Sequence, residues 1–109
     1  MDFRKFIKLL DSNSIAEIMF TNHVKWRLEE RELNTRVVED LLRKRQKALR
    51  GVEQQGEHRF KLTYLHPEKE GMDLIIVVDV KERGSKMRLT VVTVFPQLSS
   101  RRVKVVNDE

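Results

Sequence analysis

The chain contains no cysteine, and this absence excludes disulfide bonds, thiolate zinc sites and a cysteine nucleophile. No stretch approaches the ~18 consecutive apolar residues that a membrane-spanning helix needs. The first five residues, Met1 to Lys5, do not form the apolar segment of a signal peptide. Together these absences predict a soluble protein of the cytoplasm that has no membrane partner.

Glycine and histidine are also sparse, which excludes several kinds of site. The four glycines, at positions 51, 56, 71 and 84, are too scattered for a dinucleotide-binding or P-loop cradle. On one continuous strand, His58 and His66 would lie roughly 26 Å apart, too far to share a metal ion. We therefore expect neither a metal nor a cofactor.

Charged residues, by contrast, are abundant. Among 109 residues, 22 Lys and Arg stand against 17 Asp and Glu, so the net charge is +5. The length is enough for one domain. The excess of positive charge favours acidic partners such as nucleic acid or an acidic protein.

The first half of the chain has helical periodicity. A helix is predicted over residues 2–10, with Asp2 as its N-cap, and residues 11–14 break it. Two further helices are predicted over residues 23–33 and 35–47. A short strand over residues 15–20 lies between the first helix and the second.

After Gly51 the apolar period changes from helical to two. Strands are predicted over residues 58–66, 74–80 and 87–95, with a weaker edge strand over residues 48–55. Pro96 is expected to end the last of them, and the tail 99–109 either adds a strand or is disordered. Helices followed by consecutive strands predict an α+β fold, with the N-terminal helices packed on one face of a four-stranded antiparallel sheet.

The same periodicities predict which residues are buried. The expected core residues of the helix 35–47 and of two strands are Val37, Val38, Leu41, Leu42, Leu74, Ile76, Val78, Leu89 and Val91. Strict alternation along residues 87–95 would place Leu89, Val91, Thr93 and Phe95 on one face of the sheet.

The most informative segment is the helix that follows Phe20. His23, Arg27 and Arg31 are spaced i, i+4, i+8 and therefore lie along one stripe of this helix. The stripe could be an ordinary solvated helix face, with its arginines paired to Glu30, Glu32 or Glu39. The two arginines of the stripe could instead bind a phosphate. The positive end of the helix dipole favours the neutral form of the His23 imidazole, and a neutral imidazole beside two cations is a credible general base.

Residues 20–42 resemble the core of the domain-of-unknown-function 4258 family. That core usually reads Thr-x-His-Ala-x-x-Arg-Met-x-x-Arg-Gly-Ile and leads into a second helix. Here His23, Arg27 and Arg31 match, and Glu32 stands where the family often has Gly. Residues 89–95 are similar to the family's closing strand of Val-Val-Thr-Val-Tyr type, with Thr93 matching and Phe in place of Tyr at its end.

The resemblance covers roughly residues 17–95 and implies a barnase–EndoU–colicin–RelE fold over residues 15–98. Residues 1–14 would then form an N-terminal helix and linker. Many relatives in that fold are metal-independent endoribonucleases, often toxins of toxin–antitoxin systems, so the resemblance also implies RNA and an antitoxin as partners. The catalytic residues that it implies are His23, Arg27, Arg31 and Thr93.

The far end of the predicted helix 35–47 and the residues just after it form a basic run, which we expect to hold flanking phosphates of a bound nucleic acid. Cations in a last helical turn are favourable against the helix dipole, but this run is longer than a helix end requires. The expected nucleic-acid-binding residues are Arg36, Arg43, Lys44, Arg45, Lys47 and Arg50.

Two functions are therefore expected from the sequence. The first is a metal-independent endoribonuclease in which a ribose 2′-OH attacks the adjacent phosphate, with His23 as acid or base and His58, His66 or Tyr64 as its partner. The second is a non-catalytic module that binds RNA or an acidic protein through the same cations. A second proton-transfer group beside His23 in a concave site would favour the enzyme.

Overall fold

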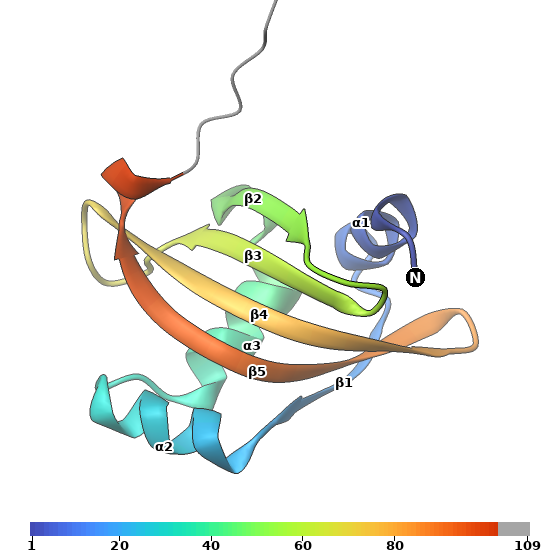
Figure 1. Ribbon diagram of the computed structural model, residues 1–109, viewed down its shortest axis with the longest axis horizontal. Coiled ribbons are helices and arrows are strands. Elements are labelled where there is room, and N and C mark those ends of the chain that lie inside the picture. The colour runs from blue at the N-terminus through green and yellow to red at the C-terminus, as the bar shows by residue number, and fades with distance from the viewer. Residues whose placement is uncertain (103–109) are drawn as a thin grey trace, which may run out of the picture.

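The computed structural model describes residues 1–102, which form three α-helices, two short 3-10 helices and a five-stranded sheet (Figure 1). The helices are α1 (Phe3–Asp11), α2 (Asn22–Glu30), α3 (Thr35–Lys44), η1 (Gln46–Ala48) and η2 (Ser99–Arg101). The strands are β1 (Ile15–Phe20), β2 (Leu49–Gln54), β3 (Arg59–Leu65), β4 (Met72–Arg83) and β5 (Lys86–Leu98). The predicted α+β class is confirmed.

Each α-helix begins where a polar side chain caps it. Asp2 accepts from the Lys5 amide at 2.8 Å, Thr21 from Val24 at 3.2 Å and Asn34 from Val37 at 3.1 Å. These caps satisfy amides that have no partner inside the helix. The helix predicted to reach residue 47 ends instead at Lys44, where the chain turns through η1 into β2.

The sheet differs from the expected four antiparallel strands. Its order is β1-β5-β4-β3-β2, and β1 pairs in parallel with β5, so the sheet is five-stranded and mixed. The four later strands are antiparallel neighbours, as expected. The pairing of β1 could not be deduced from local turns, because its partner lies about seventy residues further along the chain.

The hydrophobic core lies between the helices and one face of the sheet. In Figure 1, α3 lies behind the sheet and α1 beside the end of β3. Phe6 of α1 stacks on Phe60 of β3 with ring centroids 4.0 Å apart, so α1 packs on the same core as the other helices. The predicted core residues of β4 and β5 are all fully buried: Leu74, Ile76, Val78, Leu89 and Val91.

The alternation predicted for β5 is broken by a bulge. Val77 of β4 pairs with Thr93 and Val78 pairs with Val91, so Val92 has no partner in β4. After this extra residue Val94 points into the core, whereas Thr93 and Phe95 turn to the opposite face from Val91. The expectation that all four residues share one face was therefore wrong, since an unpaired residue shifts the side-chain period by one.

Strand β5 also continues through Pro96 to Leu98, although Pro96 was expected to end it. Strand β1 pairs only with residues 87–91 of β5, so Pro96 lies where β5 is an edge on that side. A proline is tolerated there because its missing N–H would have pointed away from the sheet. The tail expected over residues 99–109 begins with η2, and its residues 103–109 fall outside the described residues.

Candidate functional site: the α2–β5 pocket

The start of α2 is fixed by the parallel pairing of β1. Phe20, the last residue of β1, pairs with Val91 of β5, and the Thr21 amide donates to the Val91 carbonyl at 3.4 Å. Thr21 then caps α2, so the helix begins where β1 leaves the sheet. As β5 continues past Val91 while the chain turns into α2, the first turn of α2 lies beside residues 92–95.

The other end of α2 is tied to β5 as well. The Arg31 guanidinium donates from Nη1 to the Val94 carbonyl at 2.5 Å. Glu32 adopts a left-handed conformation with φ of 56°, and the Leu33 amide donates back to the Leu28 carbonyl at 2.9 Å. Many helices end with such a hydrogen bond and a left-handed residue. That residue is usually glycine, which adopts this conformation without strain, whereas here it is Glu32.

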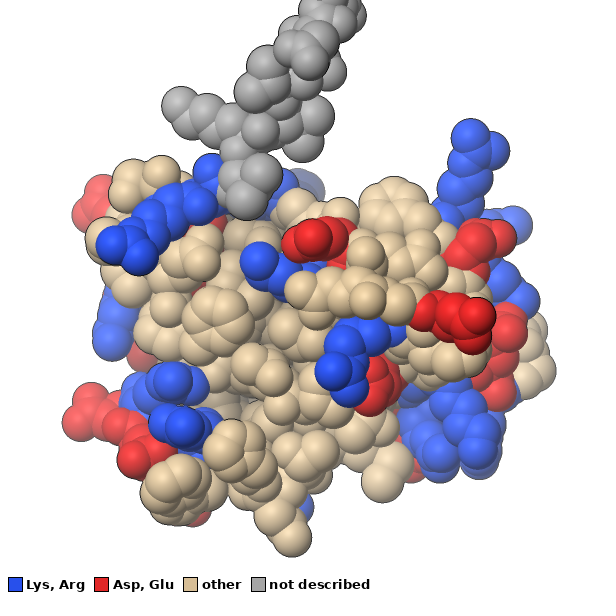
Figure 2. All heavy atoms as spheres, viewed as in Figure 1, with Lys and Arg blue, Asp and Glu red and all other residues tan. Residues whose placement is uncertain are grey.

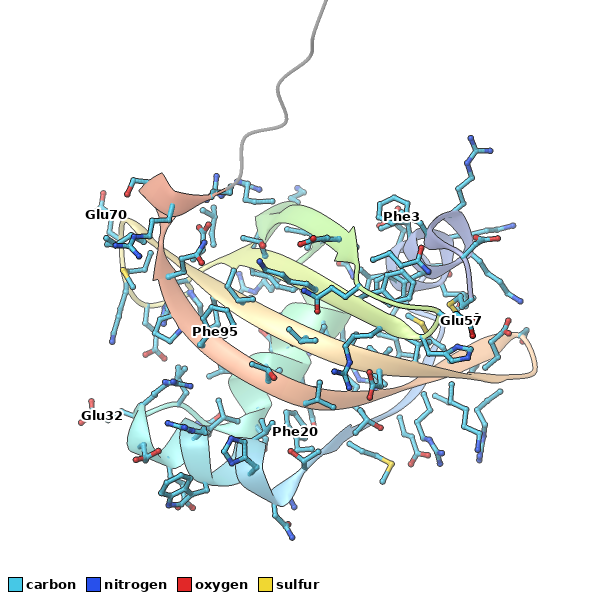
Figure 3. All side chains as sticks on the ribbon, in the orientation of Figure 1. Phe3, Phe20, Glu32, Glu57, Glu70 and Phe95 are labelled. Atoms are coloured by element: carbon cyan, nitrogen blue, oxygen red, sulfur yellow. The ribbon has the colours of Figure 1, made fainter. Side chains whose placement is uncertain are left out.

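Between α2 and β5 lies a pocket of about 230 Å³. Its lining residues are His23, Val24, Arg27, Arg31, Val92, Thr93, Val94 and Phe95. Four of them were singled out from the sequence as catalytic, and residues 92–95 of β5, which include the bulge at Val92, form the other wall. Figure 3 shows Phe95 on the part of β5 that faces α2, and Glu32 pointing outward beyond the helix end.

The two arginines of the pocket differ in their partners. Arg27 lies 3.7 Å from Glu30 in a half-exposed pair, a contact that leaves much of its charge available. Arg31 donates to a neutral carbonyl and makes no ion pair with any carboxylate of residues 1–102. Lys and Arg atoms accordingly gather over α2 and the adjoining part of β5 in Figure 2. The pocket is therefore positively charged.

His23 lies on the exposed side of the first turn of α2, and its ring centroid is 6.2 Å from that of Trp26. The three groups considered as its proton-transfer partner lie elsewhere. Tyr64 is fully buried beneath the sheet, and burial raises the pKa of its phenol far above the ordinary range. Among the described residues, neither a second imidazole nor a carboxylate nor a phenol lines this pocket.

The other two histidines occupy turns at opposite ends of β3. His66 is buried, its Nδ1 accepts from the amides of Glu68 and Lys69, and burial together with Lys69 lowers its pKa. His58 lines a different pocket, with Arg59 and Asp79. Neither His58 nor His66 therefore lies at the α2–β5 pocket.

The basic run does not form one surface beside the pocket. Arg43 donates to the Ile15 carbonyl at 3.0 Å, and Lys44 and Arg45 both lie near Asp40. Arg50 lies instead on the open face of the sheet, where it lines a pocket with Lys61 and Arg102. Arg36 and Lys47 are exposed, and none of the six predicted nucleic-acid-binding residues lines the α2–β5 pocket.

Among residues 1–102, no three His, Asp or Glu side chains are grouped closely enough to hold a metal ion. Over the same range, none of the helices has the length and apolar character needed to cross a membrane.

Comparisons with family models, curated proteins and solved structures returned no match. The assignment to the domain-of-unknown-function 4258 family therefore stays a hypothesis that depends on the residues of α2, α3 and β5 quoted above.

Two features, one in the pocket and one beside it, were not identified from the sequence: the Val94 carbonyl, which lies at the pocket, and Trp26, which contacts the lining residues His23 and Arg27. The Val94 carbonyl could not be, because a backbone atom leaves no signal in residue type. Trp26 could have been, since its i, i+3 spacing from His23 brings the two side chains together on a helix.

Proposed function

We propose that the α2–β5 pocket binds a phosphate group of RNA and that the protein is a metal-independent endoribonuclease. The observation that supports this most directly is the convergence of His23, Arg27, Arg31 and Thr93, from two distant segments, around one positively charged pocket. A pocket of about 230 Å³ is large enough for a phosphate and part of a ribose.

In the proposed reaction the His23 imidazole removes the proton from a ribose 2′-OH. The 2′-oxygen then forms a bond to the adjacent phosphorus, and the bond between phosphorus and the 5′-oxygen breaks. His23 returns the proton to that 5′-oxygen, so the products are a 2′,3′-cyclic phosphate and a 5′-OH. Arg27 and Arg31 stabilise the charge that develops on the phosphate oxygens, and the Thr93 hydroxyl donates to one of them.

The family resemblance points to the same reaction, and a barnase–EndoU–colicin–RelE fold is part of the proposal. Its support is the order of two helices, α2 and α3, before four consecutive antiparallel strands. We propose an acidic protein such as an antitoxin as a second partner, because the chain carries a net charge of +5. A cytoplasmic location is part of the same proposal.

A non-catalytic RNA-binding module is the second candidate, and one observation favours it. The pocket offers a single imidazole with no second acid or base beside it, which leaves one group to carry out both proton transfers. The same cations would bind phosphate whether or not cleavage follows.

The two candidates are separated by assaying the purified protein on single-stranded RNA in the presence of EDTA. The proposal expects cleavage that leaves 2′,3′-cyclic phosphate ends and falls ~10²-fold or more in His23→Ala, the usual effect of losing a positioned base. The matched control is His58→Ala, which removes an exposed imidazole outside the pocket. Binding without cleavage would establish the second candidate, and cleavage that needs a divalent metal would contradict the mechanism.

A further inference from the structure

Trp26 is the only tryptophan of the chain, and it is 55% exposed on the surface of α2. A single exposed apolar side chain is ordinary by itself. The other large exposed hydrophobic residues of the described chain lie on different elements: Phe3 on α1, Met19 on β1, Leu65 on β3 and Leu98 on β5. On its own helix Trp26 is surrounded mainly by charged residues, so it is not part of an apolar patch along α2.

The indole is positioned by two residues that line the α2–β5 pocket. The Arg27 guanidinium carbon lies 5.5 Å from the centroid of the Trp26 ring, within the range of a cation–π contact. The His23 ring lies 6.2 Å away and is tilted by 45°. These two contacts place the indole next to the cationic lining of the pocket.

A nucleotide has a base and a phosphate joined through one ribose. A ligand whose phosphate occupies the pocket therefore brings a base close to the surface beside His23 and Arg27, where Trp26 is exposed. Aromatic rings next to cations are the usual platform for nucleobases in single strands, because every base has a flat face that can stack. A base in a duplex presents only its edges and cannot stack in this way.

We propose that Trp26 stacks against an unpaired nucleobase of the RNA whose phosphate occupies the α2–β5 pocket, so that the substrate class is single-stranded RNA. This inference rests on the proposed function of the pocket. A protein partner is the less suitable occupant, because the residues around the indole are charged, whereas the centre of a protein interface is depleted of charge.

The position of Trp26 allows a direct measurement, because all tryptophan fluorescence of the protein comes from this site. The probe is a single-stranded 2′-O-methyl oligonucleotide of about ten residues, which cannot be cleaved because its 2′-oxygen carries no proton. A second probe has the same backbone without bases, and a third is the corresponding duplex. We expect the base-bearing single strand to quench the fluorescence and the abasic strand to bind without quenching it.

Affinities of the variants are measured by fluorescence anisotropy of end-labelled oligonucleotides. Trp26→Ala should weaken binding of the base-bearing single strand by about 5- to 100-fold, as expected for the loss of one stacked base. Trp26→Phe should restore part of that affinity. Binding of the abasic strand should be the same in the wild type and in Trp26→Ala. The matched control is Phe3→Ala, which removes an exposed aromatic side chain on α1 and should leave the affinities for both strands unchanged.

The possible failures of the two proposals differ. If the abasic strand binds and Trp26→Ala leaves the affinity for the base-bearing strand unchanged, stacking is contradicted while phosphate binding stands. A duplex bound as tightly as the single strand would overturn the assignment of the substrate class. If the wild type binds none of the three probes, the proposed function of the pocket fails, and this inference fails with it.

Discussion

Two arginines beside the sheet, Arg31 at the α2–β5 pocket and Arg102 at the start of β4, have different kinds of partner. Arg31 donates to the neutral Val94 carbonyl, whereas Arg102 donates from two nitrogens to the Asp73 carboxylate, at 2.8 and 2.5 Å. Asp73 is fully buried and also accepts from the Ser99 hydroxyl at 2.8 Å. The charge of Arg102 is therefore compensated by a protein group, and that of Arg31 is not.

This difference distinguishes an arginine that stabilises the fold from one that is available to a ligand. A guanidinium bonded in a bidentate manner to a buried carboxylate has little electrostatic attraction left for another anion. A guanidinium held in place by a carbonyl keeps its full charge and has a defined position. The partner of the arginine, rather than the residue type, indicates which of the two contributes to binding.

The largest expected effect is on catalysis, through Arg31→Ala. If Arg31 stabilises the transition state, kcat/KM for RNA should fall by about 10²–10³-fold, the usual cost of removing one such donor. The thermal midpoint should fall by several degrees, because the hydrogen bond from the charged guanidinium to the Val94 carbonyl is lost. Steady-state kinetics and thermal unfolding of the same preparation measure both quantities.

The control for charge is Arg83→Ala, which removes an exposed arginine at the end of β4. Its activity should match that of the wild type. Equal losses of activity in the two variants would show that only net charge matters and would contradict a specific site at Arg31.

The second effect is on stability, through Asp73→Ala. Loss of its hydrogen bonds to Arg102 and Ser99 should lower the free energy of unfolding by about 1.5–3 kcal/mol, as is usual for bonds that involve charged groups. Chemical denaturation measures this loss, and RNA affinity should not change. Asp79→Ala breaks the pair with Arg59, in which both side chains are about half exposed, and should cost clearly less.

The same carboxylate predicts a pH dependence of stability. Hydrogen bonds from Arg102 lower the pKa of Asp73 in the folded state, against the opposing effect of burial. The unfolded chain has an aspartate pKa of about 3.9, so this contribution is fully present above about pH 5 and is lost as the pH falls below about 4. The difference in unfolding free energy between wild type and Asp73→Ala should therefore shrink on acidification, and a constant difference would contradict the assignment.

The smallest effect is expected at the end of α2, through Glu32→Gly. Glu32 has a φ of 56°, a conformation that costs a residue with a side chain about 1 kcal/mol more than glycine. The variant should be more stable by about that amount, with unchanged RNA cleavage. Asn13→Gly, at a φ of 52°, is the matched control and should gain less, since asparagine tolerates this conformation. A destabilised Glu32→Gly would show that the glutamate side chain itself contributes to the fold.

Several features of this protein were determined by local sequence. The caps at Asp2, Thr21 and Asn34 mark where the helices begin, because a short polar side chain satisfies amides only a few residues away. The apolar period of α3 likewise identified Val38, Leu41 and Leu42 as core residues, although Val37 is only partly buried. The continuous apolar run of residues 74–78 identified β4 as a strand buried on both faces. The alignment of His23, Arg27 and Arg31 on one helix face also follows from spacing alone.

Only the tertiary structure decided what surrounds these residues. The parallel pairing of β1 with β5 brings α2 beside Thr93, and no local signal encodes a contact between segments about seventy residues apart. The bulge at Val92 turns Thr93 and Phe95 away from the core, although the residue types gave no sign of an interruption. The missing second acid or base and the different partners of Arg31 and Arg102 likewise depend on which distant atoms meet in the folded chain.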